Sequence, residues 1–131
     1  MKLYRVIQPV TDIEQAARFY SAVLATVGER VSPGRHYFDC GGTILACYDP
    51  VADGDEPGQG WQHHQNQYLY LACNDLPGAM ERVEQAGGQI TAGIEEMPWG
   101  ERLFYARDPF GNPLSLVDDR TLFTGGLENG G

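Results

Sequence analysis

The sequence predicts an α+β fold of two βαβββ modules that together form a cupped sheet with a cleft. Three observations favour it. The 131 residues suffice for one domain, and the hydrophobic and charged fractions, 42% and 21%, are ordinary for a globular protein. An amphipathic helical pattern occurs twice, each time between one apolar strand and three more. The two halves also align, since Asp12 and Asp75 precede the two helical patterns 63 residues apart.

The first module, about residues 1–49, opens on a predicted strand over residues 3–10. Thr11 and Glu14 then have the spacing of a capping box, with Thr11 as the expected N-cap. Apolar residues at helical spacing continue to Val27, and Gly28 ends the run. Three short strands are expected next, with Gly41-Gly42 as the turn between the last two: residues 30–31, 35–40 and 43–48.

A linker, about residues 50–66, has no helical or strand period and has the composition of a linker or a lid loop. The second module, about residues 67–118, repeats the order of the first. Asn74-Asp75 is the expected cap of its helix, and Gly87-Gly88 ends that helix. A polar, glycine-rich tail, 119–131, follows. The expected strands of this module are 67–73, 89–95, 101–107 and 113–117, with a tight turn over 108–112.

Charge and cysteine usage limit the function classes. The formal charge of −9 gives no basic footprint, so we expect no nucleic-acid or membrane partner. The three cysteines, Cys40, Cys47 and Cys73, form no CxxC pair, which favours buried, reduced thiols. The first residues lack the apolar run of a signal peptide, and no run approaches the ~20 residues of a membrane helix. We therefore expect a cytoplasmic protein.

Two stretches carry a family resemblance. The segment 10–20, VTDIEQAARFY, resembles the opening helix of the vicinal oxygen chelate superfamily. The segment 98–102, PWGER, followed by 108–114, DPFGNPL, resembles its closing hairpin. This superfamily includes glyoxalase I, extradiol dioxygenases, and fosfomycin- and bleomycin-resistance proteins. The resemblance covers nearly the whole chain. It implies a single domain over 1–131 and a homodimer that pairs modules between subunits.

The same resemblance implies four metal-ligand positions, which metal-binding members fill with His, Gln or Glu. In this chain they fall on the first, fourth, fifth and eighth strands, at Arg5, Ala46, Tyr68 and Ser115. Arg has no lone pair to offer, and Ala has no donor atom. We therefore expect no metal and no cofactor at these positions.

Alternation along the strands, anchored on those positions, predicts a cleft that combines aromatic rings with one cation and one carboxylate. Such a surface suits a planar or amphipathic small molecule. The alternative is that these aromatic side chains simply fill a core. The predicted ligand-binding residues are Arg5, Ile7, His36, Tyr48, Tyr68, Tyr70, Trp99, Glu101, Leu103, Tyr105 and Ser115.

Two function classes remain open. One is a protein that binds or sequesters a small molecule, like the bleomycin-resistance branch, which resembles this chain in lacking metal ligands. The other is an enzyme, a lyase, isomerase, transferase or dioxygenase-like protein, with Glu101, Tyr105 or His36 as acid or base. A non-standard metal site from His36, His63 and Glu101 belongs to the second class.

The charged residues of the cleft give one further expectation. Arg5 is expected to pair with Glu101 in the empty protein. If Glu101 points elsewhere, the fork-shaped donors of Arg5 are available to a carboxylate or phosphate group of a ligand.

Overall fold

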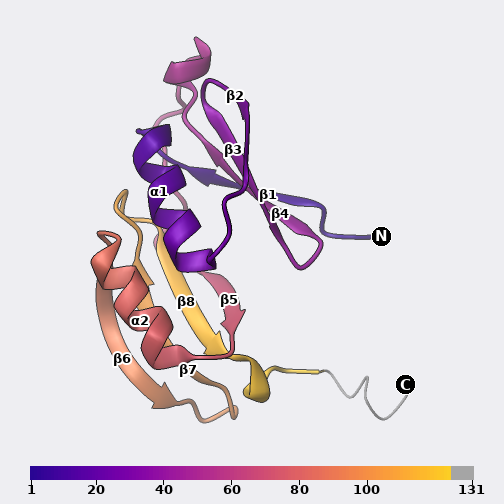
Figure 1. The fold of residues 1–131 in the computed structure, drawn as a ribbon, viewed down its shortest axis with the longest axis vertical. Helices are drawn as coiled ribbons and strands as arrows, with labels where there is room; N and C mark the ends of the chain where they lie inside the picture. Colours follow the sequence, from indigo (N-terminus) through magenta and orange to yellow (C-terminus); the bar gives the residue numbers. More distant parts are fainter. Residues whose placement is uncertain (125–131) are drawn as a thin grey trace.

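The computed structural model describes residues 1–124, and over these residues it forms two four-stranded sheets, each covered by one helix (Figure 1). The first module contains β1 (Arg5–Pro9), α1 (Ile13–Leu24), β2 (Glu29–Ser32), β3 (Arg35–Cys40) and β4 (Thr43–Tyr48). The second contains β5 (Leu69–Cys73), α2 (Leu76–Gln85), β6 (Gln89–Glu96), β7 (Arg102–Arg107) and β8 (Pro113–Asp118). The predicted repeat is therefore confirmed.

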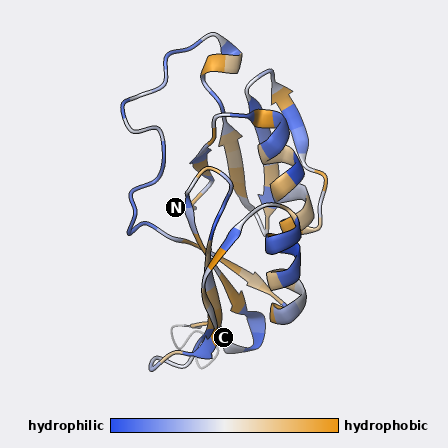
Figure 2. Ribbon diagram, turned by 90° about the vertical axis from the view of Figure 1, so that its left-hand side faces the viewer, coloured by the Kyte–Doolittle hydropathy of each residue, from blue (hydrophilic) through white to orange (hydrophobic). Residues whose placement is uncertain are grey.

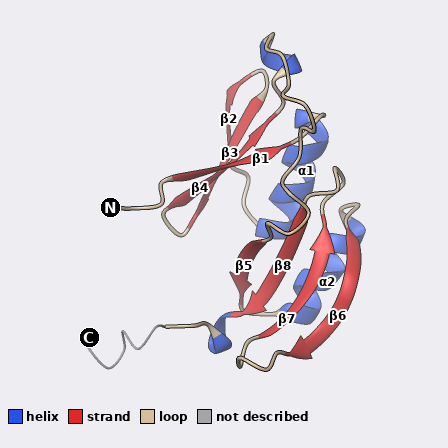
Figure 3. Cartoon of the chain, turned by 180° about the vertical axis from the view of Figure 1, so that it is seen from behind, coloured by secondary structure: helices blue, strands red, loops and turns tan. Residues whose placement is uncertain are grey.

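The two sheets share one topology. Their strand orders are β1-β4-β3-β2 and β5-β8-β7-β6, so the first strand of each module pairs in parallel with the last. The other neighbours are antiparallel hairpins. Figure 3 shows α2 behind its sheet, with the uncovered face of that sheet toward the viewer. In each module one face of the sheet packs against the helix, and the opposite face of the sheet is not covered by that helix.

Both helices begin at an aspartate. Asp12, not the expected Thr11, caps α1, and its Oδ1 accepts a hydrogen bond of 3.1 Å from the Gln15 amide. Asp75 caps α2 in the same way through the Gly78 amide. The capping-box expectation fails because Asp12 supplies the cap one residue later, which frees Glu14 to pair with Arg30 at 2.7 Å.

The core lies between the helices and the inner sheet faces. Figure 2 shows both apolar and polar residues on the helices, as expected where one helical face is buried. α1 buries five side chains and α2 three, and the two helices also contact each other. The buried helical residues are Ile13, Ala16, Phe19, Tyr20 and Val23 on α1, and Leu76, Ala79 and Val83 on α2.

A buried polar network joins the two modules. Asp108, in the turn before β8, accepts a 2.6 Å hydrogen bond from the Tyr20 hydroxyl of α1. The Gln8 Nε2 of β1 donates to the same hydroxyl at 2.6 Å. Asn112 donates to the Pro9 carbonyl oxygen at 2.7 Å and to Asp108 at 2.9 Å. A turn of the second module is thus bonded to a strand and a helix of the first.

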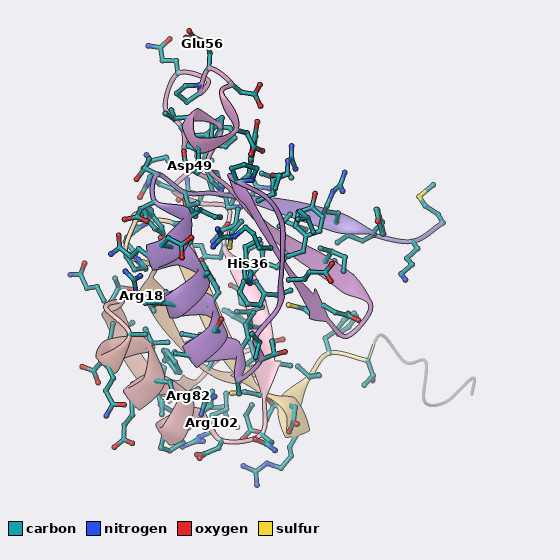
Figure 4. All side chains as sticks on the ribbon, turned by 45° about the horizontal axis from the view of Figure 1, so that its top comes forward. Arg18, His36, Asp49, Glu56, Arg82 and Arg102 are labelled. Atoms are coloured by element: carbon teal, nitrogen blue, oxygen red, sulfur yellow. The ribbon has the colours of Figure 1, made fainter. Side chains whose placement is uncertain are left out.

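The segment between the modules is held against the first module at several points. It includes a short 3-10 helix, Val51–Asp53, and the label of Glu56 marks its outer end in Figure 4. The Trp61 indole donates to the Val10 carbonyl oxygen at 3.1 Å, and Asp53 accepts from Ser32 and from the Gly34 amide. After β8 a second 3-10 helix, Asp119–Thr121, follows. The rest of the expected tail, 125–131, lies outside the described residues.

Candidate functional site

The strand register determines which side chains share the uncovered face of the first sheet. Ala46 of β4 lies between Ile7 of β1 and Tyr37 of β3. Two neighbouring rows lie on the same face. One row consists of Arg5, Ile44 and Asp39, and the other consists of Pro9, Tyr48 and Arg35. The predicted orientation of Arg5, Ile7 and Tyr48 therefore agrees with the register. Arg35 and Tyr37 also lie on this face, and the sequence analysis missed both.

His36 does not face the uncovered side, so its predicted orientation is wrong. It pairs with Cys47, and its ring lies 4.9 Å from the buried Phe38 ring, on the α1 side of the sheet (Figure 4). Its Nε2 donates to the Val27 carbonyl oxygen at 2.9 Å, while Nδ1 accepts from Arg30. Both ring nitrogens are thus bonded within the protein, which leaves neither free to serve as an acid or base.

The prediction for His36 is wrong because the two hairpins differ in length. Ser115 lies 69 residues after Ala46, but their partners Tyr105 and Tyr37 are only 68 residues apart. Counted between these paired residues, the β7–β8 hairpin is one residue longer than the β3–β4 hairpin. A shift of one residue moves a strand's side chains to the other face, so Tyr37, not His36, corresponds to Tyr105.

Arg5 and Arg35 both bind the hydroxyl of Tyr37. Each guanidinium donates to that oxygen at 3.2 Å. The Arg5 guanidinium lies 5.5 Å and 5.6 Å from the ring centres of Tyr4 and Tyr37. Arg35 lies 3.9 Å above the Tyr48 ring, and its Nε is 3.9 Å from Asp53. This face therefore carries two cations that converge on one phenol.

Three tyrosines form the centre of the second uncovered face. The Tyr105 ring on β7 lies 5.2 Å from the Tyr68 ring and 6.4 Å from the Tyr70 ring. The hydroxyls of Tyr70 and Tyr105 are 3.5 Å apart. The hydrogen bond between the hydroxyls of Tyr70 and Tyr105, with burial, raises the pKa of Tyr70 to about 12, so its hydroxyl keeps its proton at neutral pH. Tyr70 remains 52% exposed, which makes its ring available to a ligand.

Glu101 and Trp99 lie in the loop before β7 and bind each other. The Trp99 indole donates to Glu101 at 2.6 Å, and Trp99 is 62% exposed. Among the ion pairs of residues 1–124, none joins Arg5 to Glu101, so the expected pair does not form within one chain. The remaining predicted residues, Leu103 and Ser115, are fully buried, and the Ser115 hydroxyl donates to the Phe104 carbonyl oxygen.

The four positions of the family's metal ligands do not fit a divalent cation. Arg5 is a donor bound to a phenol, Ala46 has no ligand atom, and the Ser115 hydroxyl is engaged by the backbone. Over residues 1–124, no three His, Cys, Asp or Glu side chains gather in a cluster suited to a metal ion. A site made of His36, His63 and Glu101 is therefore not formed in this chain.

His63 lies on the side of the buried network. Its amide donates to Asn112 Oδ1 at 3.1 Å, and burial lowers the pKa of its imidazole. Cys47 is buried and the other two cysteines are half-buried; burial raises the pKa of all three thiols. Thiols of this kind are poor nucleophiles at neutral pH, which agrees with the expectation of unreactive cysteines.

A groove of about 830 Å³ lies between the first module and β5. Tyr68 and Tyr70 line it from β5, while Leu3, Asp39 and Ile44 line it from the first module. Its volume matches that of small-molecule pockets. The groove thus lies between the tyrosines of the second face and the end of the first sheet that carries Arg5.

Comparison with solved structures gives the same fold. A glyoxalase-related enzyme from Fulvimarina pelagi is 20% identical with a TM-score of 0.72, over 92% of this chain and 89% of that one. A glyoxalase/bleomycin resistance protein from Albidiferax ferrireducens T118 is 21% identical with a TM-score of 0.72, over 88% and 97%. A lactoylglutathione lyase from Agrobacterium tumefaciens is 18% identical with a TM-score of 0.67, over 91% and 94%.

No curated protein matches the chain. No helix within residues 1–124 is long and apolar enough to cross a membrane. A sequence model of the Glyoxalase/Bleomycin resistance protein/Dioxygenase superfamily matches residues 2–116, most of the chain. With the paired βαβββ modules, this match shows that the protein belongs to that superfamily.

Proposed function

We propose that the protein binds or sequesters a planar or amphipathic small molecule in the cytoplasm, without a metal ion. The observation that carries the proposal is the cluster of Tyr68, Tyr70 and Tyr105 beside the 830 Å³ groove. Exposed aromatic rings with few polar groups suit a flat ligand held by stacking. The proposed contact residues are Arg5, Ile7, Tyr48, Tyr68, Tyr70, Trp99, Glu101 and Tyr105.

Equilibrium dialysis against a bacterial metabolite extract, followed by mass spectrometry, tests this proposal. We expect at least one planar metabolite to be enriched with its mass unchanged. Tyr70→Ala should weaken its retention, whereas Val51→Ala, which trims an exposed apolar side chain away from the proposed contacts, is the control. A ligand at 100 times its dissociation constant should stabilise the fold by about 2.7 kcal/mol. Enrichment of no metabolite would reject the proposal.

The second candidate is an enzyme of the same superfamily. A structure of similar fold is named lactoylglutathione lyase, which keeps catalysis open on this scaffold. Tyr70, Tyr105 and Glu101 are the groups that support it, because the raised pKa of Tyr70 keeps its hydroxyl protonated as a hydrogen-bond donor to a developing negative charge. A metabolite that leaves the dialysis chamber with a changed mass would favour this candidate over simple binding.

We also propose that two chains form a homodimer. Residues 1–4 and 122–124 leave the body on one side (Figure 3). Leu3, Tyr4 and Phe123 in these segments are 69%, 60% and 86% exposed. A second copy is the proposed cover, because pairing two chains would remove these exposed apolar side chains from water. A monomer in light scattering at micromolar concentration would contradict the dimer.

A further inference from the structure

The uncovered face of the first sheet carries a cation that the rest of the chain leaves unneutralised. Arg30, Arg35, Arg102 and Arg120 each lie within 4 Å of a carboxylate. The exposed Arg5 forms no ion pair within residues 1–124. Lys2, Arg18, Arg82 and Arg107 likewise form no ion pair within these residues, and Arg5 differs from them in binding a phenol on the uncovered sheet face.

The carboxylates on the strand positions around Arg5 either bind other groups or form no ion pair with it. Asp39, in the same row as Arg5, accepts the Gly42 amide at 2.7 Å. Glu29 of β2 pairs in register with Tyr37 but forms no ion pair within the described residues. Arg35 is partly neutralised by Asp53 at 3.9 Å. This patch, Arg5, Arg35 and Tyr37, therefore holds two guanidiniums, and of these only Arg35 lies within 4 Å of a carboxylate.

The donors of the patch remain available. The Arg5 guanidinium has five N–H groups, and one of its nitrogens bonds the Tyr37 oxygen. That oxygen accepts from two guanidiniums, and its own hydrogen has no acceptor among residues 1–124. The rings of Tyr4 and Tyr37, 5.5 Å and 5.6 Å from the cation, limit its freedom. An oriented fork beside a phenol O–H matches the two oxygens of a carboxylate.

We propose that Arg5, supported by Tyr37 and Arg35, binds a carboxylate on an aromatic ligand. This inference rests on the proposed binding function and adds the charge of the ligand to it. The acid group binds the fork of Arg5, and the ring of the ligand lies against Tyr4 or Tyr37. Neutral molecules of the same shape lack the ionic hydrogen bonds and bind more weakly.

Titration of the full chain with benzoate and with neutral benzamide, followed by NMR, tests the inference. Wild-type protein should bind benzoate at least about tenfold more tightly than benzamide, as expected for hydrogen bonds between ionised groups. Arg5→Gln should remove this preference, and Arg5→Lys, which keeps the charge without the fork, should remove part of it. Arg18→Gln, on the exposed surface of α1 (Figure 4), is the control and should keep the preference. Arg5 is exposed, so none of these variants removes core packing.

The outcomes separate this inference from the function on which it rests. Equal binding of both probes, or a preference that persists in Arg5→Gln, would overturn the carboxylate site while small-molecule binding stands. Binding of neither probe by wild type would reject the carboxylate site. If Glu101→Gln then restores benzoate binding, Glu101 of a second copy occupies Arg5, which also overturns the inference. The metabolite dialysis decides the proposed function separately.

Discussion

The hydroxyl of Tyr20 forms two hydrogen bonds, one of which connects the first module to the second. It accepts from Gln8 and donates to Asp108, both at 2.6 Å, and all three residues are buried. Desolvation is the main reason that the pKa of Tyr20 is raised well above its ordinary value. The residue therefore stays neutral and bonds two modules at a point that water does not reach.

Tyr20→Phe removes this hydroxyl and leaves the ring in place. We expect a loss of about 1–3 kcal/mol in the free energy of unfolding, because Gln8 Nε2 and Asp108 each lose a buried partner. Urea denaturation measures it. The matched control, Tyr4→Phe, changes a 60% exposed residue and should cost less than about 0.5 kcal/mol. Equal stability of the two variants would show that the network does not hold the modules together.

Asp118 makes the stability of the protein depend on pH. Hydrogen bonds from Arg120, at 2.7–3.0 Å, lower the pKa of this carboxyl from its ordinary 3.8 to about 2. The unfolded chain therefore binds the proton at a higher pH than the folded chain does. The contribution is present above about pH 4 and is lost as the pH falls toward 2.

Arg120→Gln should raise the pKa of Asp118 toward 3.8 and reduce the loss of stability between pH 4 and 2. A carboxyl-carbon NMR titration measures the pKa, and urea midpoints across that pH range measure the stability. Arg18→Gln on α1 serves as the control for removal of a surface charge. An unchanged pKa of Asp118 in Arg120→Gln would contradict the assigned cause.

At the scale of elements, Gly28 sets the connection from α1 to β2. Its φ is +68°, and a Cβ there would lie 2.6 Å from the Tyr37 carbonyl oxygen and 2.7 Å from the Phe38 ring. The chain passes too close to β3 for any side chain. The sequence identifies Gly28 as a helix terminator, but this close approach depends on β3 and is visible only in three dimensions.

Gly28→Ala should destabilise the fold by about 1–3 kcal/mol more than Gly54→Ala does. Gly54 has a similar φ of +80° and nothing within 4 Å of its Cβ position, so both variants share the cost of the left-handed conformation. The difference in their free energies of unfolding thus isolates the clash. A difference near zero, measured by urea denaturation, would show that β3 moves aside without cost.

The strands and helices were largely predictable because local patterns determine them. Periodicity identified both helices and the paired modules, and the 63-residue spacing matched Arg5 to Tyr68. Side-chain orientation on β3 was not predictable from the repeat, because one extra residue in a distant hairpin reverses it. For the same reason the contact of Arg5 with Tyr37 could not be predicted, because the repeat spacing places His36 on the uncovered face instead.

At the scale of the whole molecule, two uncovered sheet faces carry different chemistry. The face of the first module carries the guanidiniums of Arg5 and Arg35 around one phenol, and that of the second is aromatic, with Glu101 at its edge. The positions that hold metal in other members of the superfamily offer no ligand set here. The central claim is that these faces bind a small molecule without a divalent cation.

A native mass spectrum of protein treated with EDTA and then incubated with a metabolite extract tests that claim most directly. We expect a non-covalent adduct with the protein, and release of a ligand of unchanged mass on unfolding. Tyr70→Ala should lower the fraction of adduct, while Val51→Ala, at an exposed residue away from the proposed contacts, should not. The claim would be contradicted by an adduct that forms only after zinc, nickel, iron or manganese is restored.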